Sequence, residues 1–373
     1  MTRQSPTTPP YPVYTPPAWL RNGLAITVYT ARWGSQKWES TTQNPEPPYQ
    51  ETIFTGAGGV PIFGWVAIPE NAHSTIVGTY GITGSLDNQW FLRLLGRKAF
   101  AQGYAVVLFD WRAHGKTAEL SPTLTSDGLY EGEDFVRIAA QAKAIGCPAS
   151  FWFTGFSLGG QLALWAVKAA QDFTTGSEDL GLEEADIKGA AVICPSLDST
   201  RSLSYLVRDP LGKQLEQAIA RELKKLAWQI HDAHPGAIEP AAIERANSIW
   251  GFDRELVIGR LGFPSVEAYY EASSGLQLLP HLNKPTLILY AADDPLFDPS
   301  IVPDLQAACD RNPDIDLLLT PYGGHVGYLS SKAGQLQAGD PDPWWAWNRV
   351  LDWCNSLSRV NKNRTTAESK STE

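Results

Sequence analysis

Short apolar runs alternate with helical patterns along most of the chain. Runs such as AVVLF (105–109) and TLILYA (286–291) are almost entirely apolar, which is typical of strands that are covered on both faces of a sheet. Between them, apolar residues recur every three or four positions, as in helices. This alternation predicts a mostly parallel, doubly wound α/β sheet. The predicted strands are 62–68, 75–80, 104–110, 150–154, 190–194, 286–291 and 316–320, and the helices among them are 89–102, 132–145 and 158–170.

The alternation stops between residues 199 and 279. This stretch contains helical patterns at 213–230, 240–250 and 265–272 and no convincing strand. A helical insertion between two strands usually lies on the face of the sheet where ligands bind. We therefore expect a helical cap at 199–279. The remaining chain divides into an extended, Pro- and Thr-rich arm (1–17), an α/β core (18–198 and 280–360) and a flexible polar tail (361–373).

Composition narrows the classes of partner. The formal net charge is −10 and the sequence pI is about 5.2, which argues against nucleic acid, because phosphate binding needs clustered Lys and Arg. No apolar leader or membrane-spanning stretch is visible in the sequence. The four cysteines have no metal-binding spacing, so we expect buried free thiols, no metal and a cytoplasmic protein.

A candidate nucleophile lies between a predicted strand and a predicted helix. Gly155-Phe156-Ser157-Leu158-Gly159 matches the pattern G-x-S-x-G, and this strand–turn–helix context is the one that the pattern needs. The turn is so tight that a side chain at either glycine would collide with its neighbours. Ser157 is held with its hydroxyl exposed, and the backbone N–H of Leu158 is a predicted oxyanion donor.

A serine hydroxyl needs a base, and the base needs an orienting acid. His325 lies in a Gly-rich loop directly after the last predicted strand, from which its imidazole can reach the end of the sheet. The acid is expected at the end of the preceding strand, where the chain reads Ala-Asp293-Asp294-Pro. We favour Asp294 over Asp293, with Asp298 third. The order Ser, acid, His is that of the α/β-hydrolase fold.

Two further loops are expected beside the nucleophile. Residues 78–85 resemble the HG-x-x-G oxyanion loop of this fold, with Tyr80 where His is usual. The backbone N–H of Ile82 is the candidate second donor and that of Thr83 the alternative. Residues 110–115 resemble the D-x-R-G-x-G turn of such hydrolases, in which Arg112 and His114 are expected to brace the loop rather than to act as a base.

Several motifs in matching order resemble one group, the YheT-like branch of the α/β-hydrolases. They cover roughly residues 15–355. In this chain they read PPAWLRNG (16–23), GITG (81–84), GFSLGG (155–160), GFPSVEAYY (262–270), ASS (272–274), DDP (293–295) and GGHVG (323–327). The resemblance implies a carboxylesterase or lipase that acts on medium- or long-chain acyl esters through an acyl-enzyme.

The chain departs from the group at two places. Residues 22–27 lack the usual His and Gln, and residues 111–115 differ from the group's FRGCGGS turn; neither departure is expected to touch the triad. Ser157 excludes dehalogenases and epoxide hydrolases of this fold, which need Asp at the elbow. An acyltransferase, an amidase or a thioesterase would use the same residues, and a non-catalytic binding protein is the alternative from another class. No cofactor is expected.

Overall fold

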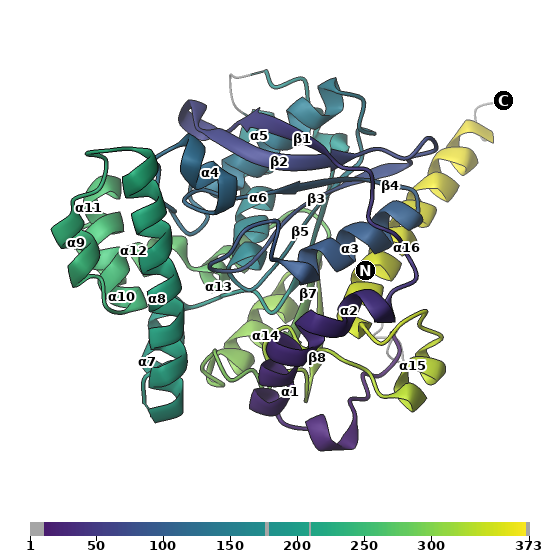
Figure 1. Ribbon diagram of the computed structural model, residues 1–373. Coiled ribbons are helices and arrows are strands. Elements are labelled where there is room, and N and C mark those ends of the chain that lie inside the picture. The colour runs from purple at the N-terminus through teal and green to yellow at the C-terminus, as the bar shows by residue number, and fades with distance from the viewer. Residues whose placement is uncertain (1–10, 176–178, 209, 371–373) are drawn as a thin grey trace.

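An eight-stranded sheet forms the centre of the computed structural model, which describes residues 11–175, 179–208 and 210–370 (Figure 1). The strand order is β1-β2-β4-β3-β5-β6-β7-β8, and only the pairs β1/β2 and β2/β4 are antiparallel. The predicted mostly parallel α/β-hydrolase sheet is confirmed. The strands are β1 (Gln50–Thr55), β2 (Pro61–Ala67), β3 (Ser74–Thr79), β4 (Tyr104–Phe109), β5 (Phe151–Phe156), β6 (Ile187–Ile193), β7 (Thr286–Ala291) and β8 (Ile315–Thr320).

Helices cover both faces of the sheet, which explains the apolar strands. Successive residues of a strand point to opposite faces. On β5, Trp152 meets Trp353 of α16 (Trp345–Lys370), with ring centroids 5.3 Å apart. The next residue, Phe153, meets Phe135 of α5 (Glu131–Ala144) at 5.4 Å. Helix α3 (Trp90–Ala101) packs beside α16, and α6 (Leu158–Thr175) beside α5.

The N-terminal part contains elements that the sequence analysis did not predict. Strand β1 reads QETIFT and is an edge strand with one solvated face, where Ile53 is 59% exposed and its neighbour Phe54 1%. Helices α1 (Gly23–Tyr29) and α2 (Ser35–Thr41) follow the segment expected to be an arm. In that segment Tyr14 is buried and donates a hydrogen bond to the carbonyl of Leu329. Residues 1–10 of the expected arm and 371–373 of the expected tail lie outside the described residues.

A group of helices stands between β6 and β7 in the chain and forms its own buried cluster beside the sheet (Figure 1). Ala113 and Leu124 of the α/β core join this cluster, so the insertion packs against the core rather than extending away from it. The helices are α7 (Ser199–Leu206), α8 (Pro210–Ala233), α9 (Pro240–Arg245), α10 (Ile249–Phe252), α11 (Ile258–Leu261), α12 (Val266–Ser273) and α13 (Gly275–Leu278).

The remaining helices are α4 (Gly115–Leu120), α14 (Ile301–Arg311) and α15 (Lys332–Ala338). No helix among the described residues is long and apolar enough to cross a membrane. The four cysteines are free and buried, as the sequence predicts.

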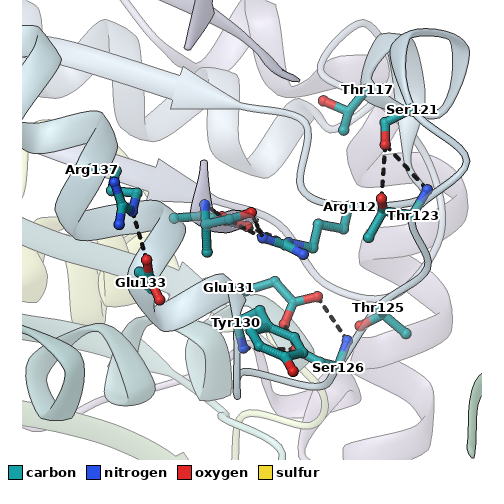
Figure 2. Close-up of polar contacts among 12 residues, drawn as sticks. Arg112, Thr117, Ser121, Thr123, Thr125, Ser126, Tyr130, Glu131, Glu133 and Arg137 are labelled. Carbon is teal, nitrogen blue, oxygen red and sulfur yellow. Dashed lines mark hydrogen bonds and ion pairs between the residues drawn. The ribbon is translucent and has the colours of Figure 1, made fainter. Parts of the chain in front are cut away.

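A buried ion pair fixes the turn that follows β4. Arg112 donates from Nε and Nη2 to the two carboxylate oxygens of Asp134 at 2.7 and 2.8 Å, and from Nη2 also to the carbonyl of Ala57. Figure 2 shows Glu131 and Ser126 turned toward each other below this pair, and both the amide and the hydroxyl of Ser126 donate to Glu131. These contacts tie the turn at 111–115 to the start of α5, the bracing role predicted for Arg112.

Candidate active site

Ser157 occupies the tight turn between β5 and α6. Its φ is +55°, a left-handed conformation that costs free energy for any residue with a Cβ. A Cβ on Gly155 would lie 2.2 Å from the carbonyl oxygen of Gly159, and one on Gly159 would lie 2.3 Å from that of Tyr80. Only glycine fits these two positions, as the sequence predicts. Leu158 begins α6, where the first N–H groups of a helix have no intrahelical acceptor.

His325 joins the serine to a carboxyl group. Its Nε2 lies 2.9 Å from Oγ of Ser157, and its Nδ1 lies 2.9 Å from Oδ2 of Asp294. The other oxygen of Asp294 accepts from the amide of Leu296 at 2.9 Å, and the imidazole lies nearly perpendicular to the ring of Phe297, with centroids 5.1 Å apart. The Asp294 side chain is almost fully buried. The structure therefore brings together the three residues that the sequence analysis selected.

The other two candidate acids have different partners. Asp293 accepts from the amide of Gly324 at 2.9 Å through Oδ1, while its Oδ2 is buried without a hydrogen-bond partner. Burial raises the pKa of Asp293. Asp298 accepts from the amide of Ser300 and lies 3.8 Å from Arg208, and its amide contact lowers its pKa. The structure describes no hydrogen bond from either group to the His325 ring.

The histidine loop rests on helix α1. Oγ1 of Thr27 accepts from the backbone N–H of His325 at 2.8 Å. A Cβ on Gly23 would lie 1.6 Å from the carbonyl oxygen of Asp293, so the helix approaches the acid loop without room for a side chain. The expectation that residues 22–27 do not touch the triad is wrong. This segment holds the backbone of both triad loops, since helix and loops pack directly together.

The predicted oxyanion loop lies against the serine. A Cβ on Gly81 would be 2.8 Å from Cβ of Ser157 and 3.2 Å from its Oγ, so only a glycine permits this approach. The next residue, Ile82, lines the cavity in front of Ser157. Thr83 has a φ of +68°, and its N–H donates to Nε2 of His114 at 3.1 Å. Thr83 is therefore already engaged, which leaves Ile82 as the candidate donor in this loop.

Tyr80 and Asp110 hold the base of this loop. The Tyr80 hydroxyl donates to Oδ1 of Asp110 at 2.5 Å, and the amide of Leu86 donates to the same oxygen at 2.8 Å. Burial raises the pKa of Asp110 to about 6. The tyrosine that replaces the usual histidine thus anchors the loop through its side chain.

His114 fixes the far side of the loop as a neutral ring. Because Nε2 accepts from Thr83, the proton resides on Nδ1, which donates to the carbonyl of Arg112 at 2.9 Å. Burial lowers the pKa of His114 to about 3, so the ring stays uncharged in the neutral range. It also lines the cavity that contains Ser157. The expectation that the divergent turn 111–115 does not touch the triad is incomplete, because His114 connects this turn to the oxyanion loop.

Replacement of His114 by alanine should lower kcat by about 10- to 100-fold, because the Thr83 amide loses its acceptor and the oxyanion loop can move. The effect should be smaller than that of removing an oxyanion donor, because the Ile82 N–H is still present. The pH dependence of the rate should keep its shape, since His114 does not titrate in this range. Ester hydrolysis across pH 5–9 measures both quantities. His73→Ala, an exposed histidine before β3, is the matched control. An unchanged kcat in H114A would contradict the bracing role.

A mostly apolar cavity opens in front of Ser157. It has an empty volume of about 930 Å³, including its mouth. Its walls come from the oxyanion loop, the turn 111–115, helices α7, α8 and α10, and the loop after β7. The aliphatic and aromatic residues among them are Ile82, Trp111, Ala113, Leu158, Leu203, Leu206, Ile219, Leu223, Leu226, Ile230, Ile249, Phe252, Tyr270, Leu296 and Phe297.

Two buried carboxyl groups also line this cavity. Asp127 comes from the loop before α5 and Asp253 from the helical insertion. Burial raises the pKa of Asp127 to about 7, and the charge of Glu131 adds to the shift. Burial and the charge of Asp127 raise the pKa of Asp253 well above its ordinary value. The Tyr270 hydroxyl donates to Asp253, and the buried hydroxyl of Tyr269 lies near both groups.

The raised pKa of Asp127 should make the free energy of unfolding fall as the pH rises. An aspartate ordinarily loses its proton near pH 4, whereas in the folded chain Asp127 keeps it to about pH 7, so stability is lost between these values. Asn does not titrate, so Asp127→Asn removes this pH-dependent loss of stability. Asn also tolerates the left-handed φ of +49° at this position. We expect the Tm of D127N to exceed that of the unchanged protein by roughly 5 °C at pH 8 and little at pH 5. Thermal unfolding at both pH values measures this; an equal difference at both would contradict it.

Sequence reasoning missed Thr27, Asp127, Asp253 and the engagement of Thr83. The patterns for Ser157, Asp294 and His325 are local, but these contacts join segments that are distant in the chain. A polar residue in an otherwise apolar helical pattern was the only available signal for Asp253. No group of His, Cys, Asp or Glu among the described residues could hold a metal ion.

Comparisons with known proteins agree with this architecture. A model described as the Alpha/beta hydrolase family matches residues 81–338. The putative esterase slr0264 of Synechocystis sp. is 55% identical over 353 residues, which cover 93% of this chain and 96% of that protein. The putative esterase YheT of Escherichia coli is 25% identical, over 82% of this chain and 84% of that protein. The solved Pyrococcus furiosus esterase Pf2001 has a TM-score of 0.50 at 16% identity, covering 88% of this chain and 96% of that chain, a likeness of fold alone.

Proposed function

Because this chain is a hydrolase that belongs to the Alpha/beta hydrolase family, in its YheT-like branch, we propose that it cleaves carboxylic esters with Ser157 as nucleophile. The observation that carries the proposal is the continuous hydrogen-bonded chain from Ser157 through His325 to Asp294. The relatives named esterases support the choice of an ester bond. The apolar cavity in front of the serine supports an acyl substrate.

Acylation begins when Oγ of Ser157 attacks the ester carbonyl carbon. Nε2 of His325 accepts the hydroxyl proton as the new C–O bond forms. Asp294 holds the ring so that Nε2 faces the serine, and its charge stabilises the imidazolium. The imidazolium then returns the proton to the leaving alkoxide, and the alcohol departs. The acyl group remains on Ser157 as an ester.

The carbonyl oxygen becomes negatively charged in this step and needs donors. The N–H groups of Leu158 and Ile82 serve this role in the proposal, because both residues line the cavity and each adjoins a residue at the nucleophile, Ser157 itself or Gly81 packed against it. Deacylation repeats the sequence with water in place of the serine. His325 takes a proton from water, hydroxide attacks the acyl carbon, and the proton passes to Oγ of Ser157. No other group is required to balance the reaction.

The cavity suits medium- or long-chain acyl groups. Most of its walls are apolar, and burying a methylene group against such walls stabilises a complex by about 0.8 kcal/mol. We further propose that residues 199–279 act as the cap of this cavity, since α7, α8 and α10 supply Leu203, Leu223 and Phe252 to its lining. Figure 1 shows the insertion beside the sheet, where it meets the core.

A series of p-nitrophenyl esters from acetate to palmitate tests this proposal. Hydrolysis should reach its highest kcat/KM at a medium or long chain and fall at both ends of the series. Leu223→Trp narrows the cavity and should move the optimum to shorter esters, whereas Leu336→Trp, on an exposed position of α15, should not. Highest activity on the acetate with no response to L223W would contradict an acyl chain in this cavity.

A further inference from the structure

Two buried carboxyl groups line the substrate cavity without a cationic partner from the described chain. Asp127 is 7% exposed and Asp253 is 6% exposed, and both line the cavity. In the part of the chain that the structure describes, no lysine or arginine lines this cavity, and its one imidazole, on His114, has its pKa lowered to about 3. Buried carboxyl groups ordinarily have a cationic partner or a metal. This pair has neither among the described residues.

The charged residues near the two carboxyl groups have hydrogen-bond or ion-pair partners outside the cavity. Glu131 accepts from Ser126 and from the amide of Gly128, and so it caps a turn instead of facing the cavity. Arg112 is bound to Asp134 and to Ala57. Arg254, next to Asp253 in sequence, pairs with Glu255. The hydroxyls of Thr125 and Tyr270 donate to the two carboxyl groups, and the hydroxyl of Tyr269 lies beside them; all three are neutral.

A second polar group in the cavity also lacks a partner. Ser202, on α7, is 4% exposed and lines the same cavity, and its hydroxyl makes no hydrogen bond within the described chain. A buried hydroxyl without a partner destabilises the empty cavity, so its position in a substrate cavity points to a ligand. This observation is independent of the two carboxyl groups, because Ser202 comes from another helix.

The pair shares its cavity and a neighbouring helix contact with the proposed nucleophile. Gln161 follows Ser157 by one turn of α6, and its side-chain amide donates to the carbonyl of Asp127 at 2.7 Å. The same amide donates to the carbonyl of Ser273, the last residue of α12. One α-helical turn rises about 5.4 Å. Because Ser157 lines the same cavity as Asp127 and Asp253, a group bound at the carboxyl pair can belong to the molecule whose carbonyl meets Ser157.

We propose that Asp127 and Asp253 form a subsite for a positively charged ammonium group of the ester substrate. This rests on the proposed esterase function and specifies its substrate as an amino ester or quaternary ammonium ester. A cation between the two groups would supply the missing balancing charge and allow both to ionise. The rings of Phe252 and Tyr270 line the same cavity and can face such a cation. An anionic substrate group at this position would be repelled.

The test compares butyrylcholine with its uncharged carbon isostere, dimethylbutyl butyrate. Calorimetry at pH 8 on the Ser157→Ala variant measures binding without turnover, so this arm is independent of hydrolysis. The charged ester should bind at least about tenfold more tightly than the neutral one. In the triple variant that adds Asp127→Asn and Asp253→Asn the preference should vanish. Asn keeps the shape of a protonated carboxyl group, and far-UV circular dichroism checks that the chain is folded.

The second arm measures hydrolysis of both esters by the protein with Ser157 intact. The ratio of the two kcat/KM values should favour the charged ester, rise with pH above 7 as the carboxyl groups ionise, and drop at least tenfold in D127N/D253N. Asp310→Asn, which removes the same charge from an exposed site on α14, should keep the ratio. Equal binding of both esters to S157A, or a preference kept in the double variant, would overturn the ammonium subsite. Failure of both esters to react while the preference in binding persists would instead count against the esterase proposal.

Discussion

Replacement of Ser157 by alanine is expected to reduce kcat of ester hydrolysis by about 10⁴- to 10⁶-fold, the largest effect of any single substitution in this chain. The reason is that the proposed attack on the ester comes from the Ser157 hydroxyl, which lies 2.9 Å from Nε2 of His325 and which alanine lacks. KM should change little, because the cavity walls remain. The same p-nitrophenyl ester series, measured at high enzyme concentration, determines the residual rate.

A measurement of thermal stability distinguishes this loss of activity from loss of the folded structure. The left-handed φ of Ser157 is unfavourable for serine and alanine alike. The substitution therefore adds little backbone strain, and S157A should have a Tm close to that of the unchanged protein. Ser204→Ala, an exposed serine on α7, is the matched control and should keep full activity. A folded S157A that retains more than about a hundredth of the rate would show that another nucleophile or water directly performs the reaction.

The second large effect distinguishes two adjacent aspartates. Asp294→Asn should lower kcat by about 10⁴-fold, because an amide at this position no longer fixes the tautomer of His325 or stabilises its charge. Asp293→Asn should cost less than about tenfold, since the Asp293 carboxyl group accepts from the backbone of the histidine loop and not from the imidazole. The two variants change one atom each and the same formal charge, so each is the control for the other.

Steady-state kinetics with one good ester substrate, together with thermal unfolding, decides between the two residues. An equal loss in both variants would mean that the loop geometry matters more than the contact to the imidazole. A larger loss in D293N would reverse the assignment. In that case the hydrogen bond between Asp294 and His325 would be a feature of the resting enzyme only.

The sheet and the positions of the predicted triad could be derived from the sequence because their signals are local. Fully apolar strands such as TLILYA are expected wherever helices cover both faces, and the observed β7 has the predicted bounds. The two glycines around Ser157 have a steric cause within five residues. Asp294 and His325 each follow a strand directly, and parallel strands bring their carboxyl ends to one edge of the sheet.

Other features required the three-dimensional contacts. Strand β1, at the edge of the sheet, has only two apolar residues among six, so its sequence contains no apolar run that would predict a strand. The hydrogen bond from His325 to Thr27 joins residues 298 positions apart. The choice of Ile82 over Thr83 depends on the ring of His114, which comes from another loop. The pair Asp127 and Asp253 forms only when the insertion packs on the core.

The most direct test of the central claim is the mass of the protein after reaction with a fluorophosphonate, which forms a covalent bond to an activated serine. Intact-mass measurement should show one adduct per chain, and peptide mapping should place it on Ser157. His325→Ala should slow the labelling by several orders of magnitude, because the base is lost. No adduct on the folded protein, or an adduct on another residue, would contradict the claim that Ser157 is the nucleophile.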